Sequence, residues 1–210
     1  MPDVISKSLD EASRVTSREQ LGALYNPPRE VVRMIETPEL DAFARDFISR
    51  SPLVMIGTEG DVASKGDAPG FVRVVDDRTL LIPERAGNNR LDTLGNILRN
   101  PVVGLMFMIP GVNEVMRIGG TAEITDDAAW LEPMAVQGKA PRTAIIIHVE
   151  QVFYNCARAF MRSKLWDPAA HGDHSDLPTP NRVVALRNGR DPDEFNRNYQ
   201  RLLSDLYENP

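Results

Sequence analysis

A segment rich in arginine, asparagine and glycine holds the side chains of this sequence that are best suited to chemistry. In IPERAGNNRLDTLGNILRNP, residues 82–101, a predicted strand ends at Pro83 and a predicted helix begins at about Arg90 or Leu91. The N-terminus of a helix exposes unpaired backbone N–H groups and the positive end of the helix dipole. Guanidinium and amide groups beside such an end form a phosphate site, and this segment supplies four of them: Arg85, Asn88, Asn89 and Arg90.

The same residues also fit a simpler interpretation. Asn88 or Asn89 caps the helix, because asparagine is among the residues preferred at that position, and the two arginines face solvent. The residue types alone do not decide between a helix cap and a phosphate site.

A second cluster of polar residues lies upstream in SKGDAPGFVRV, residues 64–74. Lys65 ends one predicted strand, and neighbouring antiparallel strands would bring Lys65 close to Arg85. Two cations at short distance repel each other unless an anion lies between them. The cluster therefore supports an anion site, and the alternative is an ordinary charged strand end at the rim of the sheet.

The elements that must position these residues are mostly strands. Apolar runs bounded by Gly, Pro, Asn and Asp predict six or seven strands, with one helix at 91–98 among them. The strands are expected at 53–58, 62–65, 71–75, 79–83, 102–109, 114–125 and 144–153. Hairpin-like connections and the lack of strand–helix alternation predict a mainly β (α+β) fold, an antiparallel barrel.

Helical segments flank the predicted strands on both sides. Before them, Thr16 or Ser17 caps a first helix, two prolines open a second, and Thr37 caps a third with Pro38 at its first position. After them come a helix through Phe160, a polar loop over 167–181 and a last helix over 194–207. The chain is thus predicted to divide into an N-terminal helical extension packing on the barrel, the barrel, and a loop with a C-terminal helix, with bounds 1–50, 51–166 and 167–210.

Composition narrows the classes of partner and compartment. The net charge of −6 argues against general binding to nucleic acid or to anionic membranes. One cysteine, Cys156, cannot form an intrachain disulfide, and no apolar run reaches the ~18 residues that span a membrane. The N-terminal residues lack the apolar centre of a signal peptide. These features predict a cytoplasmic protein without nucleic-acid or membrane partners.

The two polar clusters together resemble one family. GDAPGF at 66–71 and IPERAGNNR at 82–90 are similar to linked motifs of the pyridoxamine 5'-phosphate oxidase-related FMN-binding proteins, in a bacterial branch of that family. The similarity extends over about 53–166, more than half of the chain. It implies a six-stranded split barrel that forms a homodimer with FMN at the subunit interface, and an FMN phosphate bound by Lys65, Arg85, Asn88, Asn89 and Arg90.

The resemblance implies further flavin contacts on two other segments. The ring system would lie against the backbone of two strands, at Phe71, Val72, Arg73, Val74, Leu81, Ile82 and Pro83. NCARAFMRSKLW, residues 155–166, resembles a stretch that family members bring to the flavin from the partner subunit, with candidates Arg162, Ser163, Lys164 and Trp166.

The sequence also departs from the family's pattern. Lys65 stands where the branch has arginine, which keeps the charge but loses the bidentate fork, and Asn155 stands where it has histidine. The additional basic and histidine positions of the vitamin-forming oxidase itself have no counterpart here. The expected function is an FMN-dependent oxidoreductase acting on an unknown small substrate with an unknown electron donor. The alternatives are a flavin-binding or redox-sensing module without turnover and a relative that uses a deazaflavin or haem. No residue is assigned a catalytic role.

Other chemistry-bearing residues have simpler interpretations. His148, in the middle of a predicted strand, is expected to be structural. His171 and His174 have a spacing that suits a metal, but a zinc site normally has a third or fourth ligand at a supporting position. We therefore predict no metal site.

Overall fold

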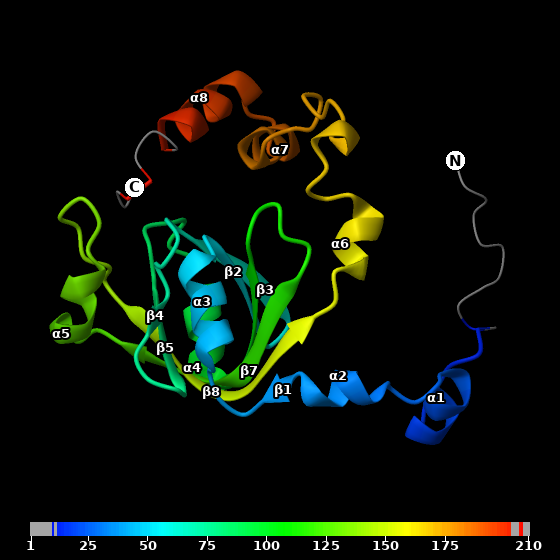
Figure 1. The fold of residues 1–210 in the computed structure, drawn as a ribbon. Coiled ribbons are helices and arrows are strands. Elements are labelled where there is room, and N and C mark those ends of the chain that lie inside the picture. Colours follow the sequence, from blue (N-terminus) through cyan, green and yellow to red (C-terminus); the bar gives the residue numbers. More distant parts are fainter. Residues whose placement is uncertain (1–9, 11, 203–205, 208–210) are drawn as a thin grey trace. The chain divides into compact units, whose positions relative to one another are not determined.

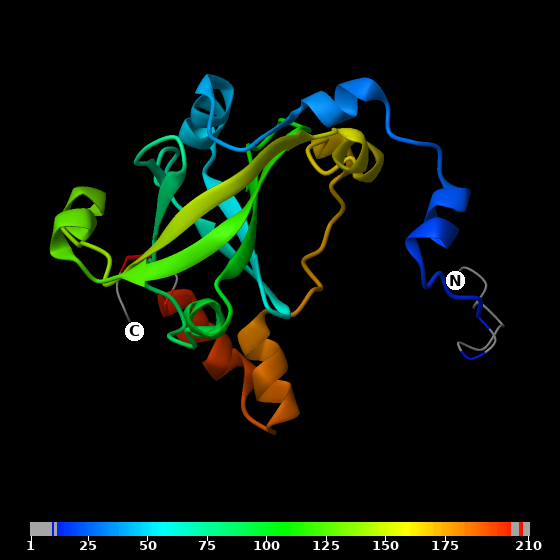
Figure 2. The same cartoon turned by 90° about the horizontal axis from the view of Figure 1, so that it is seen from below.

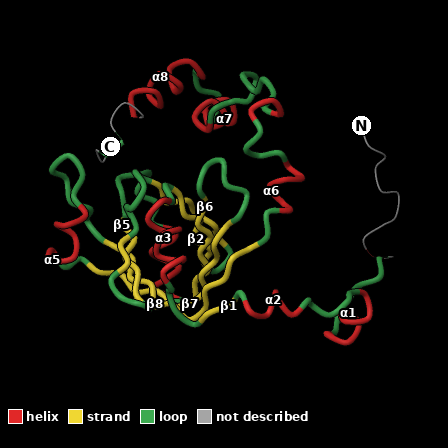
Figure 3. Tube along the Cα trace, viewed as in Figure 1, coloured by secondary structure: helices red, strands yellow, loops and turns green. Residues whose placement is uncertain are grey.

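The structure is a computed structural model that describes residues 10, 12–202 and 206–207. The chain divides into two compact units after Ile35 (Figures 1 and 3). The first unit contains helices α1 (Arg18–Leu24) and α2 (Glu30–Met34), and the Ser17 side chain caps α1. The predicted bounds of the domains at residues 50 and 166 stay a prediction.

The second unit contains the sheet and the remaining helices. Its strands are β1 (Glu36–Thr37), β2 (Leu53–Thr58), β3 (Asp61–Gly66), β4 (Arg73–Val74), β5 (Thr79–Pro83), β6 (Val102–Met108), β7 (Val115–Thr125) and β8 (Ala144–Asn155). Its helices are α3 (Ala42–Arg50), α4 (Asp92–Arg99), α5 (Ala128–Leu131), α6 (Arg158–Ser163), α7 (Pro180–Arg187) and α8 (Pro192–Leu202), with short 3-10 turns η2 (Glu132–Met134) and η3 (Pro168–Ala170).

All strand pairs are antiparallel, as the sequence predicts. The order is β3-β2-β6-β7-β8-β5-β4, with β1 paired to β8, so the sheet has eight strands and not six. The shortest strands are β1 and β4, with two residues each, and β1 was not predicted from the sequence. Figure 2 shows the two longest strands, β7 and β8, crossing the sheet side by side. The split-barrel class predicted from the sequence is confirmed.

One apolar core lies between the curved sheet and two helices. Strand β6 alternates buried and exposed residues, with Val103, Leu105 and Phe107 facing inward. Alternation of this kind gives a strand one face for the core and one for solvent. From α3, Ala44 and Ile48 pack in the same cluster. The sheet and α3 are therefore parts of one hydrophobic unit, which holds the strand ends described below in place.

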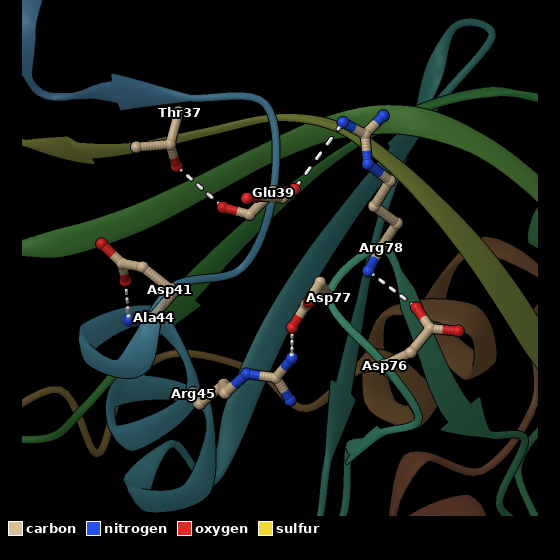
Figure 4. A network of polar contacts seen from close by, with 8 residues as sticks. All are labelled: Thr37, Glu39, Asp41, Ala44, Arg45, Asp76, Asp77 and Arg78. Carbon is tan, nitrogen blue, oxygen red and sulfur yellow. Dashed lines mark hydrogen bonds and ion pairs between the residues drawn. The ribbon is translucent and has the colours of Figure 1, made fainter.

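Helix α3 starts later than the sequence predicts. Its cap is Asp41, whose Oδ1 accepts a hydrogen bond from the Ala44 N–H at 2.7 Å, whereas Thr37 lies in strand β1. Figure 4 shows how polar contacts join this region to the β4–β5 turn, with an ion pair between Arg45 and Asp77. Thr37 was predicted as the cap because Pro38 suits a first helical position, but Thr37 is the last residue of strand β1.

The C-terminal segment contains a helix that was not predicted, which begins in the last two residues of the predicted loop 167–181. Helix α7 begins at Pro180, and Thr179 Oγ1 accepts a hydrogen bond from the Arg182 N–H. The predicted final helix corresponds to α8, although residues 203–205 of the predicted range lie outside the described residues. No helix in the described part of the chain has the length and apolar character needed to cross a lipid bilayer.

Candidate functional site

A cleft of about 1350 Å³ opens where the ends of two strands meet. Its walls come from four parts of the chain: strand β3, residues 83–94 between β5 and the first turn of α4, residues 139–143 before β8, and Tyr207 near the C-terminus. Strand β3 is one end of the sheet and β5 is next to the other end, and the two are not paired in the described sheet. The cleft therefore lies at the seam where the curved sheet fails to close.

Two ion pairs cross this seam. Lys65 Nζ lies 2.6 Å from Glu84 Oε2, and Arg85 Nε lies 2.7 Å from Asp67 Oδ2. Lys65 and Arg85 line the same cleft, but strands β3 and β5 are not paired in the described sheet, so the prediction that neighbouring strands bring them together is wrong. The strands meet only at the seam, and each cation already has a carboxylate partner, so mutual repulsion gives no argument for an anion.

The Asp67 carboxylate is the most buried charge of the cluster, with a side chain only 2% exposed. Burial by itself raises its pKa. Hydrogen bonds from the Tyr207 hydroxyl, the Ala68 N–H and the Arg85 guanidinium outweigh that effect, and the pKa of Asp67 lies below its ordinary value. The folded protein thus holds Asp67 in its ionised form more strongly than the unfolded chain does.

This pKa shift predicts a contribution to stability that depends on pH. A carboxyl group whose pKa is lower in the folded state stabilises the protein above the unfolded-state value of about 4 and loses that effect as pH falls through the folded-state value. We expect the free energy of unfolding of wild type to fall more steeply between pH 5 and pH 3 than that of Asp67→Asn, measured by urea unfolding. Glu59→Gln, which removes an exposed carboxylate at the β2–β3 turn, is the control and should follow wild type. Parallel curves for wild type and Asp67→Asn would contradict the assignment.

The loop between β5 and α4 has an unusual backbone. Asn89 and Leu91 have φ angles of 55° and 59°, in the left-handed region that branched residues such as leucine rarely adopt. Asn88 Oδ1 accepts a hydrogen bond from the Arg90 N–H at 3.1 Å, which forms a local turn. Strain of this kind concentrates in segments that contact ligands.

The N-terminus of α4 has no side-chain cap. The helix begins at Asp92, later than predicted, and Leu91 occupies the cap position without a side-chain hydrogen bond in the described structure. The interpretation in which Asn88 or Asn89 caps the helix is therefore wrong. Thr93 and Leu94 line the cleft, so the first turn of the helix faces it.

Helix α4 is held firmly behind this opening. Thr93, Leu94 and Ile97 are buried, and Asn96 Nδ2 donates a hydrogen bond to Thr58 Oγ1 of β2 at 2.9 Å. The helix therefore presents its first turn to the cleft from a fixed position.

The cleft is more basic than the chain as a whole. Five cationic side chains and three carboxylates line it: Lys65, Arg85, Arg90, Lys139 and Arg142, with Asp61, Glu84 and Asp92. The whole chain has a net charge of −6. An acidic protein with a local cationic cleft can attract a small anion there while it repels extended polyanions.

All of the predicted phosphate-binding residues line the cleft. Of the predicted ring contacts, only one does. Lys65, Arg85, Asn88, Asn89 and Arg90 line it, together with Pro83 from the predicted ring contacts. The remaining ring-contact candidates lie outside the lining: Phe71, Val72, Leu81 and Ile82 are buried, Arg73 is exposed and Val74 is half-buried. Their proposed contacts would be made by backbone, and these contacts stay a prediction.

The candidates from the C-terminal stretch lie elsewhere in the same chain. Arg162 and Ser163 belong to α6, Lys164 follows it, and none of the three lines the described cleft. Trp166 Nε1 donates a hydrogen bond to the Val112 carbonyl at 2.9 Å, and its ring stacks on Phe160. Helix α6 is thus anchored at the turn between β6 and β7.

Among the lining residues that sequence reasoning missed are four from more distant parts of the chain: Lys139, Arg142, Thr143 and Tyr207. A signal for the first three was present in the sequence. Gln137 and Gly138 form a tight turn with positive φ angles, and cations between such a turn and the next strand are candidates for the rim of a cleft. Tyr207 lies 140 residues from its hydrogen-bond partner Asp67, and no local pattern points to such a contact.

The other residues considered from the sequence lie apart from this cleft. His148 is half-exposed on the sheet, with Nε2 3.6 Å from Glu123 Oε1, and His171 Nε2 contacts the Leu165 carbonyl at 2.9 Å. Within the described ranges, no group of three or more His, Cys, Asp or Glu residues is arranged to hold a metal ion. Cys156 is exposed.

Comparison with solved structures finds similar chains. HupZ from Group A Streptococcus is 26% identical, with a TM-score of 0.42 over 52% of this chain and 88% of that one. An FMN-binding protein from Syntrophomonas wolfei is 8% identical, with a TM-score of 0.40 over 53% and 88%. An FAD-binding protein from Mycobacterium smegmatis is 18% identical, with a TM-score of 0.39 over 55% and 96%.

Comparison with the curated proteins gives no match. The sequence model of one family, described as pyridoxamine 5'-phosphate oxidase, matches residues 40–156, which is more than half of the chain. These residues include β2 to β8, the loop before α4 and both ion pairs of the seam. Because the family model matches more than half of the chain, the chain belongs to the pyridoxamine 5'-phosphate oxidase family.

Proposed function

We propose that this protein binds FMN in the seam cleft and works as an FMN-dependent oxidoreductase on a small substrate. The observation that carries the proposal is the uncapped first turn of α4, which faces a cleft lined by five cationic side chains. A helix N-terminus beside arginines is a suitable site for a phosphate group. Membership in the family supports the same assignment.

The residues of the cleft fit the phosphate of FMN. Arg85 uses Nε for Asp67 and Nη1 for the Met134 carbonyl, and a guanidinium has five N–H groups, so donors remain for a ligand. Arg90 is exposed at the end of the strained loop, and its pair with Asp92 lies at the surface. Asn88 and Asn89 add amide donors beside it. Together with the N–H groups of the first turn of α4, these side chains would hold the phosphate.

The size of the cleft also fits a flavin. Pockets for small molecules measure roughly 300–1,000 Å³, and the volume here, about 1350 Å³, exceeds that range. Space therefore remains for a substrate or for part of a second subunit beside the ring system. Strand β3 and Pro83 would form the walls nearest to the ring.

We further propose that the protein is a homodimer with FMN between its subunits. Helix α6 and Trp166 lie outside the lining of the cleft in their own chain. Arg162, Ser163, Lys164 and Trp166 would therefore reach the flavin only from a partner subunit, as the resemblance implies. The exposure of Arg162, Ser163 and Lys164 is compatible with such a role.

The chemistry would belong to the bound flavin, which accepts and donates hydride or single electrons. The residues of this chain would bind the phosphate, orient the ring and limit water in the cleft. A flavin-binding or redox-sensing role without turnover, and a deazaflavin or haem in place of FMN, are the alternatives that the experiment below separates.

The test is a titration of the purified protein with FMN, followed by flavin fluorescence. We expect saturable binding near one FMN per subunit and about tenfold weaker binding for Arg90→Ala, since a hydrogen bond to a charged group contributes roughly 1.5 kcal/mol or more. Arg187→Ala, an exposed arginine at the end of α7, is the control and should bind as wild type does.

Three further measurements complete this test. Sedimentation should give a dimer, and oxidation of NAD(P)H with a panel of acceptors separates an oxidoreductase from a module without turnover. Parallel titrations with a deazaflavin and with haem test the alternative cofactors. No saturable binding of FMN at micromolar concentration would overturn the proposal.

A further inference from the structure

Tyr207, close to the C-terminus, contacts the candidate phosphate site. The Tyr207 hydroxyl donates a hydrogen bond to Asp67 Oδ1 at 2.7 Å, while Asp67 Oδ2 accepts from Arg85 Nε. The Tyr207 ring centroid lies 6.0 Å from Arg85 Cζ, at the outer limit of a cation–π contact. Tyr207 thus contacts both members of the Asp67–Arg85 ion pair, one of the two that cross the seam.

A pair of packed helices precedes this tyrosine. Helices α7 and α8 contact each other, and Figure 1 shows them as neighbours near the C-terminus. Thr179 Oγ1 hydrogen-bonds to Asn196 Oδ1 at 3.1 Å, Asn181 Nδ2 donates to the Phe195 carbonyl, and Ala185 is fully buried. The described structure therefore contains a packed C-terminal helical pair upstream of Tyr207.

We propose that Tyr207 is a positioning residue of the binding cleft, which holds Arg85 in the orientation that binds an anion. This inference rests on the proposed function. The Tyr207 hydroxyl joins the Ala68 N–H on one oxygen of Asp67 and leaves the other oxygen for Arg85 Nε, so the carboxylate is held in a single orientation. Arg85 is then fixed by Asp67 on one side and by the Met134 carbonyl on another. Its remaining N–H groups are available to a phosphate in the cleft.

Tyr207 forms a wall of the cleft and does not fill it. With Tyr207 in place as one of its lining residues, the cleft still has a volume of about 1350 Å³. A residue that blocked the site would leave little space beside Arg85. Tyr207 should therefore strengthen anion binding. A residue that inhibited the site would weaken it.

The first experiment needs no ligand. The chain has four tyrosines, so protein labelled with 3-fluorotyrosine gives four ¹⁹F resonances, and Tyr207→Phe identifies the one that belongs to Tyr207. We expect this resonance to lie away from its position in the urea-unfolded chain and to move towards that position in Asp67→Asn. The Arg85 Nε–H signal, identified by its loss in Arg85→Lys, should shift in Tyr207→Phe and broaden in Tyr207→Ala. A Tyr207 resonance at the unfolded position in wild type, or an unchanged Arg85 signal, would overturn the inference.

The second experiment measures FMN affinity in the full chain. We expect about fivefold weaker binding for Tyr207→Phe, which keeps the ring, and about twentyfold weaker binding for Tyr207→Ala, which loses the ring and the hydroxyl. Tyr199→Phe, in α8 and outside the cleft lining, is the matched control. Unchanged affinity in Tyr207→Ala would overturn the positioning role, and tighter binding would identify an inhibitory tail. If wild type binds no FMN, the proposed function fails, and the ligand-free signals of Tyr207 and Arg85 decide this inference separately.

Discussion

Arg85→Ala is expected to lower FMN affinity about 50-fold and to destabilise the protein by about 2–3 kcal/mol. The loss of affinity follows because a hydrogen bond to a charged group contributes roughly 1.5–3 kcal/mol, and Arg85 is held in place by Asp67 and the Met134 carbonyl. The loss of stability follows because the substitution leaves the Asp67 carboxylate, 2% exposed, without its cation. Fluorescence titration measures the first effect and urea unfolding the second.

A double variant separates these two effects. Asp67→Asn combined with Arg85→Ala removes both charges, so no buried charge remains unpaired, and most of the lost stability should return. FMN affinity should stay low, because the guanidinium is still missing. An Arg85→Ala protein with wild-type affinity would show that the phosphate lies elsewhere, and a double variant with restored affinity would show that the single variant failed only through misfolding.

The strands that frame the cleft could be predicted closely from the sequence. The predicted runs 53–58 and 79–83 coincide with β2 and β5, and the other five predicted strands overlap β3, β4, β6, β7 and β8. Apolar runs and turn residues are local signals, so they locate these elements well. Only β1 was missed, because a strand of two residues carries too little pattern to be recognised, and the total of six strands implied by the resemblance was therefore too low.

The pairing of charges at the seam could not be predicted in the same way. Asp67 and Glu84 were present in the two polar clusters, but the sequence does not say which strand ends meet when a curved sheet leaves a gap. The prediction assumed that neighbouring strands bring Lys65 and Arg85 together, whereas the meeting point depends on the whole strand order. Contacts between residues far apart in the chain, such as Tyr207 with Asp67, have the same cause.

Gly120→Ala is expected to destabilise the protein by about 3 kcal/mol or to prevent its folding. A Cβ atom added at Gly120 would lie 2.0 Å from the His148 carbonyl oxygen, closer than any non-bonded contact allows. The obstacle is backbone of the paired strand, which cannot move aside as a flexible side chain does. For a chain of this length, such a loss would lower the melting temperature by roughly 6–12 °C, which calorimetry would measure.

The reason lies in a β-bulge that shapes the sheet. Gly119 pairs with Gln151 and Gly120 with Val149, so Glu150 is left without a partner and β8 bends at this point. The bend separates the part of β8 that pairs with β5, beside the cleft, from the part that pairs with β1. Gly119→Ala is a closely matched control, because a Cβ there meets only the Gln151 side chain, at 3.5 Å. We expect that variant to melt within about 2 °C of wild type. Equal stability of the two variants would mean that β8 yields at the bulge, and the curvature that opens the seam would then not depend on the close approach at Gly120.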